Sequence, residues 1–317
     1  MSAALRVELA LAPSPTAEGH PRLPRTAERS GHPFAPYSPC GDSCLPLTST
    51  LPRCSWARSV ARLVRLAALM VGAALLALAW PLLTRRRRAA STTWLYRSVL
   101  RAAGVRLVRA GDGSFAPPGT GTLVVANHVS WLDILALGAG EPVRMIAKRE
   151  VRSWPVIGTL AARTGALFVD RTGLRALPAV VEETAAALAT GALVGVFGEA
   201  TTWCGAAAGP FRRAVFQAAL DAGVPVRPVA LRYRLLDGRA STAPAFLGSE
   251  TLWASLLRVV RLPGVVCELD ILPLLQPAAG TDRRALAAAA QRAVTAATGV
   301  AATAAPGPSP RLAAVAA

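Results

Sequence analysis

The sequence predicts an α/β domain with a largely parallel sheet flanked by helices, preceded by an N-terminal membrane helix. After Gly104, short runs rich in β-branched residues alternate with helical stretches, a pattern typical of parallel sheets in α/β proteins. Before that point, residues 66–83 carry no charge and are long enough, as a helix, to nearly match the apolar core of a bilayer. These two observations separate a membrane-associated segment from an enzyme-sized domain.

Composition narrows the classes of partner. The chain has 317 residues, enough for one enzyme-sized core with appendages. Its hydrophobic fraction of 53% excludes bulk disorder. A net charge of +17 predicts attraction to polyanions, and an aromatic fraction of 5% disfavours the stacking surfaces of single-strand nucleic-acid binders. We therefore expect an anionic membrane or a phosphorylated substrate as the partner, and no nucleic acid.

Residues 1–55 are expected to be a disordered, proline-rich leader, because they show no sustained apolar period of a helix or a strand. The cysteines of the chain are scattered and odd in number, so neither a disulfide framework nor a zinc ribbon is predicted. Cys40 and Cys44, with His20 and His32 upstream, could ligate a metal. An unstructured leader is the favoured interpretation.

Residues 56–103 are predicted to be membrane-associated helices of basic and apolar character. Three interpretations of the apolar stretch stay open: a single span, which is favoured, a shallow interfacial helix, and a buried core helix. Pro81 lies near one end of the stretch, and Arg62 and Arg65 lie one turn before the other. These positions suit the interfacial interpretation, because the arginines could snorkel.

Four arginines, Arg85 to Arg88, directly follow the apolar stretch, so anionic membrane lipid is the natural partner. More arginines lie on the C-terminal side of the stretch than on its N-terminal side. The positive-inside rule then places the catalytic domain on the cytoplasmic face of the cell membrane. A second amphipathic segment, residues 94–103, could also lie on the membrane.

Residues 104–300 form the predicted α/β domain, and residues 301–317 are expected to be a disordered tail. Strands are predicted at 122–126, 143–147, 166–169, 192–197, 226–232 and 265–272, and helices at 131–138, 155–164, 174–190, 212–222, 250–261 and 282–298. In such folds, ligands bind at the carboxyl ends of the strands. Candidate site residues are therefore sought directly after each strand.

His128 follows the strand predicted at 122–126, where an imidazole is well placed for acid–base chemistry. In one continuous helix, Asp133 would lie on a different face from His128. A direct contact therefore requires His128 in a loop and Asp133 in the first turn of the next helix. The carboxylate would then fix the imidazole tautomer and leave the other ring nitrogen to accept a proton. A histidine held at a strand end beside a capping aspartate is the alternative.

Further motifs make the pattern specific. The heptad from Asn127 to Asp133 is followed in order by the segments GALFVDR (165–171), VFGEATT (196–202) and VPVRPV (224–229). These segments resemble the four ordered blocks of the glycerolipid acyltransferase family. The bacterial 1-acyl-glycerol-3-phosphate acyltransferases are the most similar group, and the resemblance covers roughly residues 105–275.

This resemblance implies the following chemistry. His128 would be the general base that deprotonates the acceptor hydroxyl, oriented by Asp133, and the oxygen would attack the acyl thioester directly. The donor would be acyl-CoA or acyl carrier protein, and the acceptor lysophosphatidic acid, giving phosphatidic acid. Neither a metal nor a cofactor is implied.

The remaining site residues follow from the same resemblance. Arg171, Glu199 and Thr201 would hold the glycerol phosphate, with Glu199 orienting Arg171 or a glycerol hydroxyl. Lys148 is a candidate second cation for the phosphate, and an ordinary exposed lysine is the alternative. Asn127 and Pro228 would support the motifs, and the fourth block would shape the acyl-donor side.

Two residues depart from the family pattern. The third block usually reads F-P-E-G-T, whereas here Gly198 replaces the proline and Ala200 the glycine. Ala200 adds a Cβ where glycine allows close backbone approach or a positive φ, and Gly198 loosens the loop. The acceptor could therefore be another lysolipid, such as a lyso-ornithine lipid. A catalytically impaired lipid-binding homologue is the other alternative, in which restoring both residues should raise activity.

Overall fold

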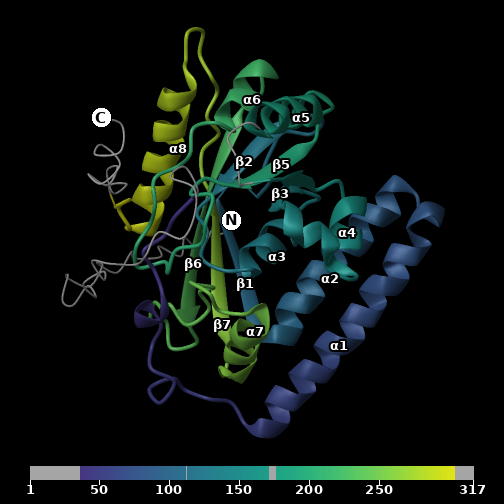
Figure 1. Cartoon of the computed structure of the whole chain (residues 1–317), viewed down its shortest axis with the longest axis vertical. Helices are drawn as coiled ribbons and strands as arrows, with labels where there is room; N and C mark the ends of the chain where they lie inside the picture. The colour runs from purple at the N-terminus through teal and green to yellow at the C-terminus, as the bar shows by residue number, and fades with distance from the viewer. Residues whose placement is uncertain (1–35, 112, 171–175, 304–317) are drawn as a thin grey trace, which may run out of the picture.

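The computed structural model describes residues 36–111, 113–170 and 176–303. Within these residues, seven strands form one sheet in the order β1-β7-β6-β2-β5-β3-β4 (Figure 1). The strands are β1 (Val105–Gly111), β2 (Thr122–Ala126), β3 (Arg144–Lys148), β4 (Leu167–Val169), β5 (Leu193–Phe197), β6 (Val226–Leu235) and β7 (Val265–Ile271).

The predicted largely parallel sheet is confirmed. Strands β6, β2, β5, β3 and β4 run in one direction, whereas β7 is antiparallel to β6 and β1 is parallel to β7. The carboxyl ends of the parallel strands consequently meet at one edge of the sheet. The motif residues that follow β2, β3, β4 and β5 in the sequence are thus brought to the same edge.

Helices cover both faces of the sheet (Figure 1). The helices are α1 (Trp56–Ala79), α2 (Arg85–Ala103), α3 (Leu132–Gly138), α4 (Ile157–Arg163), α5 (Leu177–Ala189), α6 (Phe216–Asp221), α7 (Leu252–Arg261) and α8 (Arg283–Thr298), with short 3₁₀ turns at Asp42–Cys44, Trp80–Leu82 and Arg149–Ser153. Strand β2 shows how both faces are buried: Val124 and Ala126 join the core under α2, α3 and α7, while Leu123 and Val125 join the core under α5, α6 and α8. This central strand therefore positions the residues that follow it rigidly.

Strand β1 was not predicted from the sequence. It lies at the edge of the sheet, paired on one side with β7. Arg106 and Arg109 interrupt its apolar residues, and much of the strand is exposed or half-buried. An edge strand with charged residues avoids pairing with other chains, but it also lacks the apolar run that marks a buried strand.

The segment from residue 36 to residue 55 packs on the domain, which differs from the predicted disordered leader. Cys40 and Cys44 are 4% and 8% exposed. Leu45 and Leu51 pack against the core on the face of the sheet that α2, α3 and α7 cover. The Thr242 hydroxyl donates a hydrogen bond to the Cys44 carbonyl at 2.7 Å. These long-range contacts, invisible in local periodicity, order the segment. Residues 1–35 lie outside the described residues.

The first residues of the segment predicted to be a disordered tail are instead part of the domain. Ala302 forms a bridge with Ala208, and the Thr303 N–H donates to the Ala208 carbonyl at 2.9 Å. Residues 301–303 therefore continue the domain, and residues 304–317 lie outside the described part of the chain.

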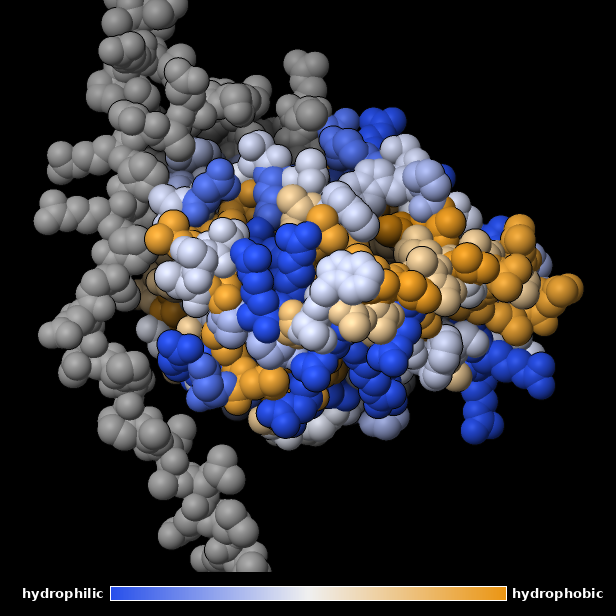
Figure 2. Space-filling view, turned by 90° about the horizontal axis from the view of Figure 1, so that it is seen from below, coloured by the Kyte–Doolittle hydropathy of each residue, from blue (hydrophilic) through white to orange (hydrophobic). Residues whose placement is uncertain are grey.

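Among the described residues, one helical stretch, Trp56–Leu82, is long and apolar enough to cross a membrane. Along its length α1 lies beside α2 (Figure 1), and it also contacts α7 and α4. The inner face of α1 contributes Leu66 and Ala73, which pack against Leu95 and Ala102 of α2, Val260 of α7 and Leu160 of α4. The outer face of α1 exposes Val64, Val71, Leu75 and Leu78, and Leu82 of the following 3₁₀ turn is also exposed. Figure 2 shows hydrophobic residues gathered on this side of the molecule.

Arg62 has a role that differs from the predicted snorkelling. It is 8% exposed, and its guanidinium donates hydrogen bonds to the carbonyls of Val260, Leu262 and Pro263 at 2.9, 2.6 and 2.9 Å. These carbonyls lie at the C-terminal end of α7 and just beyond it, where backbone acceptors lack helical partners. The side chain thus links the start of α1 to the end of α7 in the α/β domain.

We expect Arg62→Ala to lower the free energy of unfolding by about 3 kcal/mol, because three buried carbonyls lose a charged donor. Arg65→Ala is the matched control, since Arg65 lies one turn further along α1 and is exposed. Thermal unfolding of both variants in the same detergent measures the difference. Equal midpoints for the two variants would contradict the assignment.

Candidate active site

The predicted contact between His128 and Asp133 is present. His128 lies in the loop after β2, and Asp133 is in the first turn of α3. His128 Nδ1 and Asp133 Oδ2 are 2.8 Å apart. Because a carboxylate accepts hydrogen bonds, Nδ1 carries the proton and Nε2 keeps its lone pair. The geometry therefore gives a histidine whose free nitrogen can accept a proton.

Asp133 is fully buried, and hydrogen bonds compensate its charge. Besides His128, its Oδ2 accepts the N–H groups of Val129 and Ser130 at 2.7 and 2.8 Å. Its Oδ1 accepts the hydroxyl of Tyr233 on β6 at 2.6 Å. Burial, and then the charge of Asp133, raise the pKa of Tyr233 well above its ordinary value, so the phenol remains a donor.

Sequence reasoning missed Tyr233 because it lies 100 residues from Asp133. It also missed the aromatic support of the imidazole. The rings of His128 and Phe197 are stacked, with centroids 3.7 Å apart and an angle of 4° between the planes. The backbone N–H of Trp203 donates to the His128 carbonyl at 2.8 Å. Phe197 ends a predicted strand, but no local pattern signals either contact.

Glu199 supports the backbone of His128. Its Oε2 accepts the His128 N–H at 2.6 Å, and its Oε1 accepts the Gly209 N–H at 2.9 Å. Both oxygens are therefore engaged by backbone groups, a role different from the predicted orientation of Arg171 or a glycerol hydroxyl. Burial raises the pKa of Glu199 to about 8, against the opposing effect of the two N–H groups.

Asn127 joins two strands at the base of the site. Its amide nitrogen donates to the Leu231 carbonyl at 3.0 Å, and its amide oxygen accepts the Leu231 N–H at 2.8 Å. The side chain thus extends the pairing of β2 with β6 beyond the end of β2. Pro228 lies in β6 opposite Val125 of β2, where its carbonyl accepts the Leu272 N–H at 3.1 Å. The predicted supporting role of both residues agrees with these contacts.

The altered third block has a clear local geometry. Ala200 has a φ of 60°, the left-handed conformation in which the family's glycine is unstrained. A Cβ on Gly198 would lie 2.5 Å from the ring of Phe211, and the Gly198 N–H donates to the Ala126 carbonyl at 2.9 Å. Proline at this position would remove that donor and collide with the ring.

The remaining predicted residues lie apart from His128 or outside the described residues. Lys148 is exposed at the carboxyl end of β3. Thr201 is half-buried and does not line the pocket beside His128. Arg171 lies outside the described residues, directly after Asp170, whose carboxylate is 3.2 Å from the Arg149 guanidinium. The structure therefore brings together Asn127, His128, Asp133 and Glu199, and Thr201 lies in the same loop, between Glu199 and Trp203, which both bond the backbone of His128.

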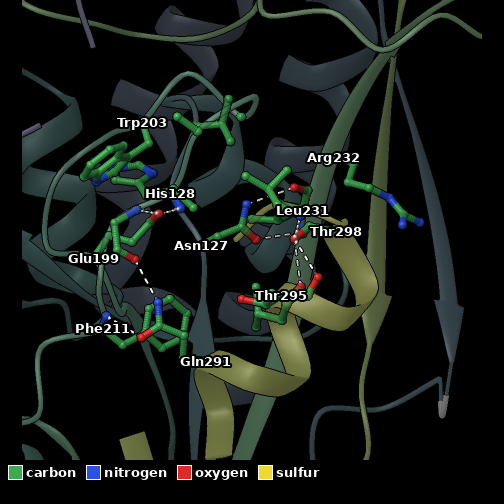
Figure 3. Close-up of a pocket in the computed structure, with 17 residues that line it drawn as sticks. Asn127, His128, Glu199, Trp203, Phe211, Leu231, Arg232, Gln291, Thr295 and Thr298 are labelled. Carbon is green, nitrogen blue, oxygen red and sulfur yellow. Dashed lines mark hydrogen bonds between the residues drawn. The ribbon is translucent and has the colours of Figure 1, made fainter. Parts of the chain in front are cut away.

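A small pocket opens beside His128 (Figure 3). It is bounded by the end of β2, by β6, by the loop 203–211 and by α8. Arg232 contributes to its wall, but its guanidinium points away from His128 and bonds to Glu268 and Asp270. Gln291 of α8 holds the opposite wall through the Phe211 N–H and the Gly209 carbonyl at 3.1 and 3.0 Å.

Comparisons with known proteins agree with this arrangement. A family model described as acyltransferase matches residues 108–232. Over 239 residues the chain is 37% identical to a lyso-ornithine lipid O-acyltransferase of Pseudomonas aeruginosa, a match that covers 73% of this chain and 88% of that protein. The chain belongs to the acyltransferase family. The family resemblance read from the four sequence blocks is thereby confirmed.

Other relatives share shorter regions. Over 169 residues the chain is 38% identical to a 1-acyl-sn-glycerol-3-phosphate acyltransferase of Neisseria gonorrhoeae, which covers 52% of this chain. The match spans 65% of the length of that relative. The crystal structure of PlsC, the 1-acyl-sn-glycerophosphate acyltransferase of Thermotoga maritima, superposes with a TM-score of 0.55 at 20% identity, covering 75% of this chain and 96% of that one. This likeness confirms the fold.

We expect that replacing Ala200 and Gly198 by the residues usual in the family will change the free energy of unfolding in opposite directions. Ala200→Gly should raise the free energy of unfolding by about 1 kcal/mol, because it relieves a left-handed alanine. Gly198→Pro should lower it by at least about 2 kcal/mol, because it removes a backbone donor and displaces the Phe211 ring. Thermal unfolding of the two single variants measures both effects, and shifts of the same sign would refute the local geometry.

The raised pKa of Glu199 predicts a pH-dependent stability. The folded state holds the proton up to about pH 8, whereas the unfolded carboxyl releases it near its ordinary pKa of 4.5. The contribution of Glu199 to the free energy of unfolding is therefore fully present below about pH 4.5. It declines as pH rises from about 4.5 to about 8, by at most about 1.4 kcal/mol per pH unit.

Glu199→Gln isolates this effect, because glutamine does not titrate. The difference in unfolding free energy between the parent and the variant should shrink as pH is raised from 5 to about 8. Denaturant unfolding at three pH values in this window measures it. A difference that is constant, or that grows with pH, would show that Glu199 is already ionised in the folded protein.

Proposed function

We propose that this chain is a lysolipid O-acyltransferase in which His128 is the general base. The observation that carries the proposal is the 2.8 Å contact between His128 Nδ1 and a fully buried Asp133, which leaves Nε2 as the proton acceptor. The ring is also stacked on Phe197, so its orientation is set before substrate binds. General-base assistance of this kind contributes about 10²–10⁴ in rate.

The reaction proceeds by direct transfer. Nε2 of His128 takes the proton of the acceptor hydroxyl while the oxygen attacks the carbonyl carbon of the acyl thioester, from acyl-CoA or acyl carrier protein. The tetrahedral intermediate collapses, the carbon–sulfur bond breaks, and the thiolate receives the proton from the imidazolium. Asp133 stabilises the imidazolium between these steps. The chemistry requires neither a catalytic metal nor a cofactor.

Lysophosphatidic acid is our first candidate acceptor. Lys148 is the last residue of β3, and Asp170 directly follows β4; both strands are parallel to β2 and end at the same edge of the sheet. β3 is two strands from β2, so Lys148 is separated laterally from the base by about 10 Å. That separation suits a phosphate one glycerol length from the reacting hydroxyl, with Arg171 as the second proposed cation.

A lyso-ornithine lipid is the second candidate. The long match with the Pseudomonas aeruginosa lyso-ornithine lipid O-acyltransferase favours it, because it extends over 88% of that protein. The altered third block also favours an acceptor different from that of enzymes with the usual sequence. A catalytically impaired homologue is disfavoured, since His128, Asp133, Tyr233 and Glu199 form a complete hydrogen-bonded set.

We further propose that α1 lies on the cytoplasmic face of the cell membrane and does not span it. Its inner face packs on α2, α4 and α7 from end to end, while its outer face exposes aliphatic side chains. A helix fixed to the domain along its whole length can immerse only that outer face. Arg85 to Arg87, exposed at the start of α2, would contact anionic headgroups.

The reaction is tested with membranes containing the parent protein or its His128→Ala variant. Each is incubated with long-chain acyl-CoA and either lysophosphatidic acid or lyso-ornithine lipid, and the acylated product and free CoA are followed. We expect turnover by the parent and at least about a hundredfold less by the variant. The acceptor with the higher kcat/KM identifies the substrate.

Two controls make the result decisive. Circular dichroism of the purified variant verifies that it is folded, so that lost activity reports the base. Arg239→Ala, an exposed residue in the turn after β6, serves as a mutant control with parental activity. Undiminished turnover by His128→Ala would exclude the proposed base, and no turnover of either acceptor by the parent would exclude the proposed function.

A further inference from the structure

Three cysteines from two distant parts of the sequence lie together, next to the loop in which Trp203 bonds the backbone of His128. The sulfurs of Cys40, Cys44 and Cys204 all lie within 4.8 Å of one another, and all three residues are buried. Cys40 and Cys44 come from the N-terminal segment, whereas Cys204 lies in the loop after Glu199. No described histidine or carboxylate joins this group.

The spacing of the sulfurs suits a metal ion better than a disulfide. A Zn²⁺ ion bound by thiolates at about 2.3 Å in tetrahedral geometry places its sulfurs about 3.8 Å apart. The three sulfurs need to approach by at most about 1 Å to reach that spacing. A disulfide would use two of them and leave the third buried with no role. We propose that Cys40, Cys44 and Cys204 bind one structural Zn²⁺ ion.

Local backbone geometry supports the proposal on both sides of the cluster. The Cys44 N–H donates to the Gly41 carbonyl at 2.9 Å, which closes a tight turn and brings Cys44 back toward Cys40. On the other side, Gly205 has a φ of 85°, a left-handed turn directly after Cys204 that glycine adopts without strain.

The fourth coordination position is assigned to water. Asp42 and Gly205, which neighbour the cluster in the chain, are exposed, so solvent reaches its surroundings. His20 and His32, which the sequence suggested as partners of Cys40 and Cys44, lie outside the described residues. The donor set of three sulfurs selects a thiophilic ion such as zinc over magnesium or calcium.

The ion would join two parts of the chain that carry the site. One is the segment 36–45, and the other is the loop in which Trp203 bonds the His128 carbonyl and Glu199 bonds the His128 N–H. Since Cys204 directly follows Trp203, fixing its sulfur limits movement of the loop behind the imidazole. The ion is thus a structural clamp and takes no part in acyl transfer.

The test is the metal content of the full-length protein, purified in detergent under anaerobic, reducing conditions and supplied with Zn²⁺ before removal of unbound metal. Elemental analysis should give about one zinc per chain for the parent and less than about 0.1 for Cys40→Ser, Cys44→Ser and Cys204→Ser. Cys54→Ser is the matched control and should keep the parental zinc. Cys54 lies near Ser59 and Val260, away from the cluster.

Two further measurements separate binding from folding. Circular dichroism identifies any serine variant that is unfolded, and Co²⁺ substitution of the parent should give a thiolate-to-cobalt absorption band that the folded cluster variants lack. Parent protein that holds no zinc after loading, or zinc retained by Cys204→Ser, would overturn the proposal. An intact mass two hydrogens lower would do so as well, by revealing a disulfide. None of these measurements depends on acyl transfer, so the outcome is independent of the proposed function.

Discussion

The site depends on a single buried negative charge. Asp133 is inaccessible to solvent, and an uncompensated carboxylate in such a position would cost several kcal/mol. Four donors compensate it: the imidazole, two backbone N–H groups and the Tyr233 hydroxyl. Because Tyr233 belongs to β6, this compensation requires β6 to lie beside β2 in the observed register, which Asn127 fixes at the end of the strands. The architecture of the sheet and the orientation of the imidazole are therefore linked through one carboxylate.

Two acidic side chains, Glu199 and Asp133, hold the backbone of the loop that carries His128. Glu199 accepts the N–H of His128, and Asp133 accepts the next two N–H groups, those of Val129 and Ser130. The backbone on which the imidazole is mounted is thus fixed at three consecutive residues. Burial raises the pKa of Glu199 to about 8, and the charge of Asp133 acts in the same direction. The raised pKa of Glu199 therefore reflects both its burial and its position beside a second carboxylate.

Local sequence patterns predicted the buried part of this structure well. Six strands followed from runs rich in apolar residues, most completely β2, which is buried at every residue. Strand β1 was missed because Arg106 and Arg109 interrupt it at the sheet edge. His128 and Asp133 could be paired because both lie within one loop–helix unit. Tyr233 could not be added, since only the strand order brings it to Asp133. The same limit applies to residues 36–55, which local patterns assign to a disordered leader: Cys40 and Cys44 are buried by residues that are distant in the sequence.

The altered third block packs against the wall of the pocket and leaves the contacts of His128 intact. The space that a side chain at residue 198 would occupy is filled by the Phe211 ring, and the Phe211 N–H is held by Gln291 of α8. The Gly198 carbonyl accepts the Arg212 N–H at 2.7 Å, so the block and the loop 209–212 form one hydrogen-bonded unit. Ala200 accepts a left-handed conformation to preserve the turn that aims Glu199 at His128. Both replacements therefore lie in the hydrogen-bonded unit that includes Phe211, a residue of the pocket wall. The groups that would carry the proton are held independently of them, because the contacts of His128 and Asp133 use the backbone of residues 129 and 130 and the Tyr233 hydroxyl.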